Sequence, residues 1–210
     1  MTTALHSEEQ RVVLHDISWD LYEALLCAHL DRSVPRFTYD RGELEIMSPS
    51  PEHDQIKETV TLLINIVAEE TGVNAMSYGS TTFRVKDRKR GFEPDACFYI
   101  DNLPRIHGKK VLDLRIDPPP DLVIEVDITR SSIDKLSIMA EFGVPEVWLY
   151  GKKGWRILRL GKGTYVEQPA SKSFPLLTPE SLTALIKPRN EIAPLAWMRH
   201  VREWVRKAIS

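Results

Sequence analysis

Hydrophobic residues recur along this chain with two different periods, and these periods predict where helices and strands lie. Between residues 51 and 72, apolar side chains lie three or four positions apart, which is the spacing of one helical face. Pro51 suits the start of this helix and Gly72 suits its end. Between residues 121 and 128, apolar residues are almost continuous around acids at alternate positions. That pattern predicts a buried strand near the centre of a sheet.

The remaining segments continue this mixture of helices and strands. Helices are also expected at about 19–30 with Ser18 as cap, at about 132–142 with Ser131 or Ser132 as cap, at 179–186 and at about 190–208. Strands are also expected at 36–39, 43–47, 77–85, 93–99, 146–150, 155–160 and 165–167. This order predicts an α/β fold with a mixed sheet and one core. The expected division is an N-terminal tail over 1–14, a domain over 15–187 and a C-terminal helical extension over 188–210.

Composition narrows the class of protein. The chain has 210 residues, of which 42% are hydrophobic and 28% are charged, which is ordinary for a globular protein that buries a core. Its net charge of −2 argues against a strong non-specific DNA binder, but it is compatible with a local basic cleft. Cys27 and Cys97 match no metal or redox spacing, so we expect small apolar groups in a reducing compartment. Without an apolar signal core or a membrane-length apolar run, the expectation is a cytoplasmic protein without membrane contact.

Asp95, Glu125 and Lys135 are the strongest candidates for chemistry. Along the predicted central strand, Asp121 lies about 13 Å from Glu125, which is too far for both to bind one ion directly, whereas Asp127 lies about 7 Å away. Asp95 belongs to a neighbouring predicted strand and can come within one strand spacing of Glu125. Lys135 follows in the first turns of the next predicted helix. The pattern therefore predicts two acids and one lysine in a common site.

Two carboxylates and one ammonium are enough to hydrolyse a phosphodiester with a hard divalent cation. Asp95 and Glu125 would bind Mg²⁺, for which Mn²⁺ can substitute, and Lys135 would orient or deprotonate the attacking water. In the alternative interpretation, Glu125 and Asp127 are half-buried acids paired with arginines such as Arg130. Burying a carboxylate without a cation or strong donors is unfavourable by several kcal/mol, which weakens that alternative for Glu125. Both interpretations stay open on these residues alone.

Six blocks of sequence occur in an order that resembles a known family. The blocks are Gly42–His53, Phe83–Val85, Glu93–Asp95, Pro120–Val126, Lys135 and Gly143–Trp148. Together they resemble, over about residues 15–185, the Uma-two family of bacterial restriction-endonuclease-like proteins with the PD-(D/E)XK nuclease fold. The resemblance implies a restriction-endonuclease-like mixed sheet flanked by helices and a Mg²⁺-dependent endonuclease whose substrate is DNA.

The resemblance also implies roles for individual residues. Asp95 resembles the aspartate of the family motif, and Glu125 resembles its (D/E) position. Asp127 stands where the motif has its lysine, so the resemblance implies that Lys135, on the following helix, supplies the ammonium. Asp127 is then an accessory residue that can either add a third metal ligand or repel the substrate. Met139 is a further departure, because the family usually has tyrosine there.

Other charged residues are weaker candidates. His53 opens the long helix, whose N-terminus attracts phosphate, and is kept as an accessory group. Glu58 could supply a first-helix acid, although a solvated helix face explains it more simply. The Lys152-Lys153 pair could contact phosphates, although a solvated turn is the simpler interpretation. The C-terminal helix can clamp DNA, but covering the core or forming a homodimer explains its pattern more simply.

These observations lead to a principal hypothesis and two alternatives. The principal hypothesis is a metal-dependent nuclease that hydrolyses phosphodiester bonds in DNA. The first alternative is a catalytically weak or inactive nuclease-fold protein that binds nucleic acid or a protein partner, which Asp127 and the negative net charge favour. A metal-dependent hydrolase of small phosphate esters would need the same three residues.

Overall fold

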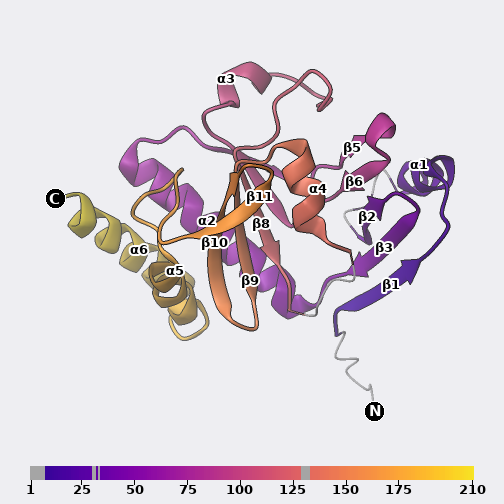
Figure 1. Cartoon of the computed structure of the whole chain (residues 1–210). Helices are drawn as coiled ribbons and strands as arrows, with labels where there is room; N and C mark the ends of the chain where they lie inside the picture. The colour runs from indigo at the N-terminus through magenta and orange to yellow at the C-terminus, as the bar shows by residue number, and fades with distance from the viewer. Residues whose placement is uncertain (1–7, 30–31, 33, 129–132) are drawn as a thin grey trace, which may run out of the picture.

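A six-stranded mixed sheet lies at the centre of the computed structural model, which describes residues 8–29, 32, 34–128 and 133–210 (Figure 1). Its strands are β4 Met76–Gly79, β7 Ala96–Tyr99, β8 Leu122–Val126, β9 Glu146–Gly151, β10 Gly154–Gly161 and β11 Thr164–Gln168. They follow the order β11-β10-β9-β8-β7-β4, with β8 parallel to β9 and antiparallel to β7. The strand predicted at 121–128 is therefore central, and the predicted α/β fold with a mixed sheet is confirmed.

Helices cover both faces of this sheet. The α-helices are α1 Trp19–Ala28, α2 Pro51–Thr71, α3 Leu103–Ile106, α4 Lys135–Phe142, α5 Pro179–Ile186 and α6 Pro194–Ile209, and the 3₁₀ helices are η1 Lys86–Arg88 and η2 Lys187–Asn190. Leu122 and Ile124 of β8 pack in one buried cluster with α2, α5 and α6, while Val123 packs in another with α4 (Figure 1). Alternate residues of β8 thus contact opposite layers, and each fully buried aliphatic side chain contributes about 1.5–3 kcal/mol.

A second sheet lies beside the first. Its strands are β1 Gln10–Leu14, β2 Arg36–Asp40, β3 Glu43–Ser48, β5 Phe83–Val85 and β6 Arg90–Phe92, in the order β1-β3-β2-β6-β5. α1 packs on this sheet through Trp19 and Tyr22, and the Tyr22 ring stacks on Tyr39 with centroids 4.7 Å apart. Phe92 of β6 meets Phe142 of α4 with centroids 5.7 Å apart. The second sheet is therefore joined to the first through the layer that contains α4.

The segment predicted as one strand over 77–85 is instead two strands in different sheets. β4 pairs with β7 in the six-stranded sheet, whereas β5 pairs with β6 in the five-stranded sheet. The chain changes direction after Gly79, whose φ of 59° is a left-handed conformation that glycine adopts readily. Alternation in a sequence reports which side chains are buried, but not which neighbour a strand pairs with, so the prediction of one strand was wrong.

Local capping sets where the two helices nearest the acids begin. Ser50 caps α2 by accepting a hydrogen bond from the backbone N–H of His53 at 3.2 Å, with Pro51 in the first turn as predicted. Asp134 caps α4 by accepting one from Ser137 N at 3.2 Å, so α4 begins later than predicted. The predicted caps Ser131 and Ser132 lie outside the described residues.

Both ends of the chain take part in the main fold. Residues 10–14, which were predicted within an N-terminal tail, form β1 and pair with β3. In α6, Trp197, Val201 and Val205 are fully buried in the same cluster as α2. The predicted C-terminal helix therefore covers the core, which is one of the two simpler interpretations of its sequence.

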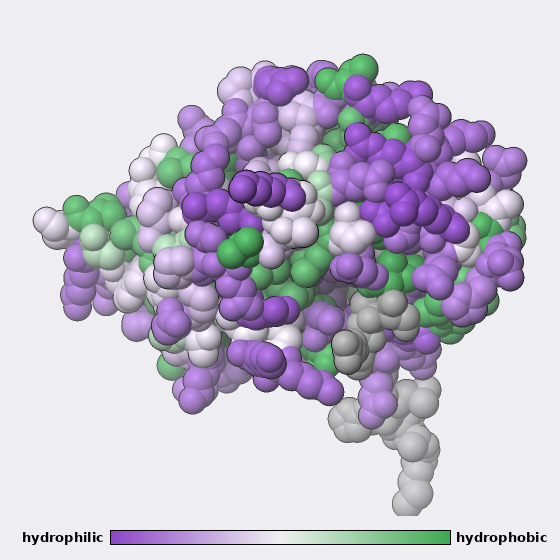
Figure 2. Space-filling view, in the orientation of Figure 1, coloured by the Kyte–Doolittle hydropathy of each residue, from purple (hydrophilic) through white to green (hydrophobic). Residues whose placement is uncertain are grey.

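The outer surface is mainly polar on the face seen in Figure 2, where apolar residues form small patches between hydrophilic ones. Large apolar side chains such as Trp148 and Phe98 are fully buried. Among the helices of the described residues, none combines the length and the apolar character that crossing a membrane requires.

Candidate active site

Asp95 and Glu125 lie on neighbouring strands at the end of the β7–β8 pair. Ala96 of β7 pairs with Ile124 of β8, so extending the antiparallel register by one residue places Asp95 opposite Glu125. Directly opposed residues of an antiparallel pair have Cβ atoms about 4.5–5.5 Å apart and share a face. Both residues are buried, at 1% and 4% relative exposure. The strand register therefore brings together the two acids that the sequence singled out.

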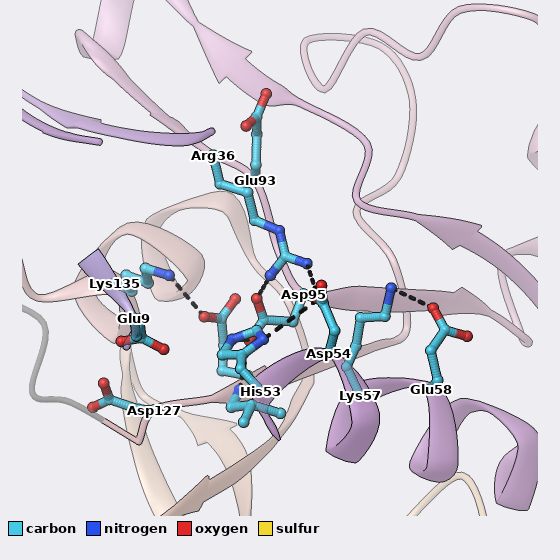
Figure 3. Close-up of polar contacts among 12 residues, drawn as sticks. Glu9, Arg36, His53, Asp54, Lys57, Glu58, Glu93, Asp95, Asp127 and Lys135 are labelled. Carbon is cyan, nitrogen blue, oxygen red and sulfur yellow. Dashed lines mark hydrogen bonds and ion pairs between the residues drawn. The ribbon is translucent and has the colours of Figure 1, made fainter. Parts of the chain in front are cut away.

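Lys135 reaches this acid pair from α4. It is the first residue of that helix, and its Nζ donates a hydrogen bond to Glu125 Oε2 at 2.9 Å (Figure 3). Its side chain is only 11% exposed, so the ammonium is held beside the carboxylate in a largely dry position. A lysine ten positions after the acid thus occupies the same site, because α4 packs across the face of β8 that carries Glu125.

Asp95 is held by three groups from different parts of the chain. Its Oδ2 accepts a hydrogen bond from the backbone N–H of Val126 at 2.6 Å and lies 3.1 Å from His53 Nε2. Its Oδ1 forms an ion pair with Arg36 Nη1 (Figure 3). The carboxylate is therefore fixed by the strand that carries Glu125, by the start of α2 and by the second sheet.

Arg36 is the site residue that the sequence analysis missed. It is the first residue of β2, its side chain is 6% exposed, and Arg36 Nη2 also lies 3.7 Å from Asp54 Oδ1. Burial lowers the pKa of Arg36, whereas the negative charges of Glu125 and Asp54 oppose that shift. The available signal for Arg36 was its position in a strand whose next three residues are buried. A guanidinium is rarely buried without an acid partner, so such an arginine indicates a buried ion pair.

His53 is a neutral group at this site. Its ring is fully buried, and burial lowers the pKa of His53 to about 4, with the positive charge of Arg36 acting in the same direction. Near neutral pH the imidazole therefore carries no charge beside Asp95. The predicted accessory histidine does lie at the acid pair, on the side where α2 begins.

Asp127 faces away from the acid pair. It follows the end of β8, where its backbone N–H donates a hydrogen bond to Tyr150 O at 2.7 Å. Its Oδ1 accepts a hydrogen bond from Arg11 Nη2 at 3.3 Å, and Figure 3 shows its carboxylate turned away from Asp95. Arg130, proposed as a partner for the strand acids, lies outside the described residues. The negative charge of Asp127 is thus paired with Arg11 of β1. Although Asp127 is close to Glu125 in sequence, its side chain points in another direction.

The weaker sequence candidates have structural explanations. Glu58 is exposed and pairs with Lys57 at 2.6 Å, away from Asp95 in Figure 3. Asp121 accepts hydrogen bonds from the backbone N–H groups of residues 100 and 102 at 2.7 and 2.9 Å, as expected of a turn acid. On α6, Arg202 and Arg206 pair with the α2 acids Glu69 and Glu70. These arginines hold α6 on the core, which is the simpler interpretation of the C-terminal helix.

The donor set at the acid pair fits a hard divalent cation. Glu125 Oε1 is a buried oxygen that has no hydrogen-bond partner in the described part of the chain, whereas Asp95 Oδ1 faces the Arg36 guanidinium. Within the same residues, no group of three or more His, Cys, Asp or Glu side chains is arranged to hold a metal. Mg²⁺ is commonly bound through one or two carboxylates while water and substrate phosphate complete its octahedron. The Glu125 and Asp95 carboxylates provide that number of acids, with Glu125 Oε1 open and Asp95 Oδ1 shared with Arg36.

Comparisons with known proteins agree on one region of the chain. Residues 19–188 match the family Uma2, whose description is "Putative restriction endonuclease". A crystal structure of a "putative nuclease belonging to DUF820" from Anabaena variabilis ATCC 29413 is similar, with a TM-score of 0.51 and 20% sequence identity, over 71% of this chain and 90% of that chain. At this identity the likeness shows the fold alone, and it confirms the predicted nuclease-like fold class. No curated protein matches the chain.

Proposed function

The chain belongs to the Uma2 family, and from this premise we propose that it is a metal-dependent nuclease that hydrolyses phosphodiester bonds in DNA. One observation carries the proposal: the buried carboxylates of Glu125 and Asp95 lie opposite each other, Glu125 Oε1 is open, and Lys135 Nζ lies 2.9 Å from Glu125 Oε2. The same arrangement supports Asp95 and Glu125 as the groups that would hold Mg²⁺ or Mn²⁺. When bound, the cation supplies positive charge for the developing phosphorane and the leaving oxygen.

The protein's own residues would orient the other reactants. Lys135 has three N–H donors and uses one on Glu125, so the others can orient a water for in-line attack on phosphorus. Asp95 is kept in one orientation by the Val126 N–H and by Arg36. Neutral His53 beside Asp95 adds no charge that would oppose a cation there. Fixed carboxylates of this kind lower the reorganisation needed when charge builds up on the phosphate.

Substitution of Glu125 tests the proposal. Glu125→Gln keeps the shape of the side chain but removes its negative charge, and Glu58→Gln is the matched control on an exposed glutamate. In plasmid nicking with Mg²⁺ or Mn²⁺, we expect Glu125→Gln to lose about 100-fold or more of the cleavage rate, as removal of one group that stabilises transition-state charge does elsewhere. Glu58→Gln should cut at the parent rate. Thermal melting shows whether both variants stay folded, and a folded Glu125→Gln variant that cuts at the parent rate would refute the assignment.

A second candidate function, binding without cleavage, is favoured by one specific observation. Each of the two acids already has a cationic partner, because Arg36 pairs with Asp95 and Lys135 pairs with Glu125. Calorimetric titration with Mn²⁺ separates the two functions: a nuclease should bind Mn²⁺ and lose binding in Asp95→Asn, whereas a pure binder should show no Mn²⁺ heat. Supercoiled, linear and single-stranded DNA, together with a small phosphodiester, then define the substrate class.

A further inference from the structure

A groove of about 480 Å³ opens between the end of β8, from Asp127 onward, and the turn that joins β9 to β10. It is lined by Asp127, Ile128, Leu149, Gly151, Lys152, Lys153, Gly154 and Arg156. Gly151 pairs with Gly154, so the loop between the two strands consists of Lys152 and Lys153 alone. A two-residue loop of this kind places both lysines at the tip of a hairpin that borders the groove.

Positive charge dominates this groove. Lys152 and Lys153 are exposed, and in the described ranges of the chain neither ammonium belongs to an ion pair shorter than 4.0 Å. Arg156 makes one exposed contact, from its Nη1 to Glu167 Oε1 at 3.2 Å. The acidic residue of the lining, Asp127, forms an ion pair with Arg11. A chain with a net charge of −2 therefore has a local basic surface at this point.

The register of the sheet sets how far the groove lies from the acids. β8 and β9 are parallel, with Glu125 beside Leu149 and Val126 beside Tyr150. Lys152 follows Leu149 by three residues, which corresponds to about 10 Å of extended strand. Successive phosphates of one DNA strand rise by about 3.4 Å along the duplex axis and also wind around it, so this separation corresponds to at most about three nucleotides.

Glycine at position 151 allows the hairpin to run close to the end of β8. A Cβ built on Gly151 would lie 3.3 Å from the backbone oxygen of Asp127, which is tighter than most real Cβ contacts. The hairpin and the acid-bearing strand thus form neighbouring walls of the groove, and the basic loop stays beside the strand that carries Glu125.

From this geometry we propose that the groove binds the sugar-phosphate backbone of DNA within about three nucleotides of the scissile phosphate. Lys152 and Lys153 are the phosphate contacts, with Arg156 as a third basic group. The proposal rests on the proposed nuclease function and adds to it the surface along which the substrate strand runs. Contacts of this type position the nucleic acid without reading its sequence.

The test is the salt dependence of DNA binding by the full chain. Anisotropy of a fluorescent duplex is titrated in EDTA at several KCl concentrations for the parent, for Lys152→Gln/Lys153→Gln, and for the control Lys162→Gln/Lys207→Gln. Lys162 lies in the β10–β11 turn at the other end of β10, Lys207 lies in the last turn of α6, and both are exposed. Removing two phosphate contacts should reduce the slope of log K against log salt by about 1.8, whereas the control pair should leave it unchanged.

Cleavage measured in parallel separates this proposal from the proposed function. If the parent cuts plasmid with Mg²⁺ and the Lys152/Lys153 variant keeps the parent salt slope and KM, the groove proposal is overturned and the nuclease assignment stands. If the slope falls only in that variant but the parent never cuts, the groove is supported and the nuclease assignment fails. An equal fall in the control pair would mean that general charge, and not this groove, attracts DNA, and would overturn the groove proposal.

Discussion

Replacing Arg36 with methionine should destabilise the protein strongly, because it leaves the buried carboxylate of Asp95 without its cation. The Arg36 and Asp95 side chains are 6% and 0% exposed. Removing one partner of a buried ion pair typically destabilises a protein by about 3–5 kcal/mol. For a chain of this length, each kcal/mol shifts the melting temperature by about 2–4 °C, so a decrease of about 6–20 °C is expected.

A double-mutant cycle isolates the Arg36–Asp95 interaction from the loss of packing. Arg36→Met, Asp95→Asn and the double variant are unfolded in urea and followed by tryptophan fluorescence. Asp95→Asn removes the charge that needs Arg36, so the double variant should be more stable than the sum of the single effects predicts, by about 1.5 kcal/mol or more. Arg84→Met is the control, since Arg84 and Glu23 form an exposed pair, and such pairs contribute about 0.2–1 kcal/mol.

Two results would refute this reasoning. If the single effects add within about 0.5 kcal/mol, Arg36 and Asp95 are not coupled. If Arg36→Met is no less stable than Arg84→Met, the guanidinium does not compensate a buried charge. A further readout concerns the proposed metal site: with the competing guanidinium removed, Mn²⁺ should raise the melting temperature of Arg36→Met more than that of the parent, because a ligand that binds only the folded state stabilises it.

Three other predictions follow from single residues. Trp197→Ala should reduce the free energy of unfolding, measured in urea, by about 3–5 kcal/mol. The reason is that the indole is fully buried and its Nε1 donates a hydrogen bond to Leu185 O at 2.7 Å. A loss below about 1 kcal/mol would show that α6 is separable from the core. Burial raises the pKa of the Cys97 thiol to about 12, whereas Cys27 is exposed. Iodoacetamide at about pH 8 should therefore add one group to the folded chain, at Cys27, and two groups to the chain unfolded in urea, as counted by mass spectrometry. Rapid double labelling of the folded protein would contradict this. Asp127→Ser should change the rate of plasmid cleavage less than about fivefold, because the Asp127 carboxylate pairs with Arg11. Partly exposed ion pairs of this kind contribute about 0–1 kcal/mol to stability. A loss of about 100-fold in the cleavage rate would instead make Asp127 a metal ligand.

The elements nearest the acids could be predicted because their signals are local. Ser50, Pro51 and Gly72 bound α2 through capping and left-handed backbone geometry, which act within a few residues. The apolar run around Glu125 predicted a central strand, because both faces of β8 are buried. The segment at 77–85 was mispredicted because the division between two sheets depends on partners far along the chain.

The acid pair divides in the same way between local and long-range causes. Pairing of Asp95 with Glu125 follows from two neighbouring strands, and Lys135 follows from the helix after β8, so the sequence order itself limited the choices. Arg36 comes from the other sheet, 59 positions before Asp95, and no local pattern indicates which buried acid an arginine will meet. The direction of Asp127 was also beyond the sequence, because it depends on Arg11 in a strand that was predicted as a tail.

Local patterns were enough to predict the α/β class, the central strand, the long capped helix and the two acids with their lysine, because hydrophobic period, capping and strand spacing are properties of consecutive residues. The packing of the whole chain was needed to show that Arg36 faces Asp95, where the basic hairpin of Lys152 and Lys153 lies, and that α6 packs against α2. These features depend on contacts between segments far apart in the chain. Such contacts are selected by the packing of the whole molecule, which no single stretch of sequence encodes.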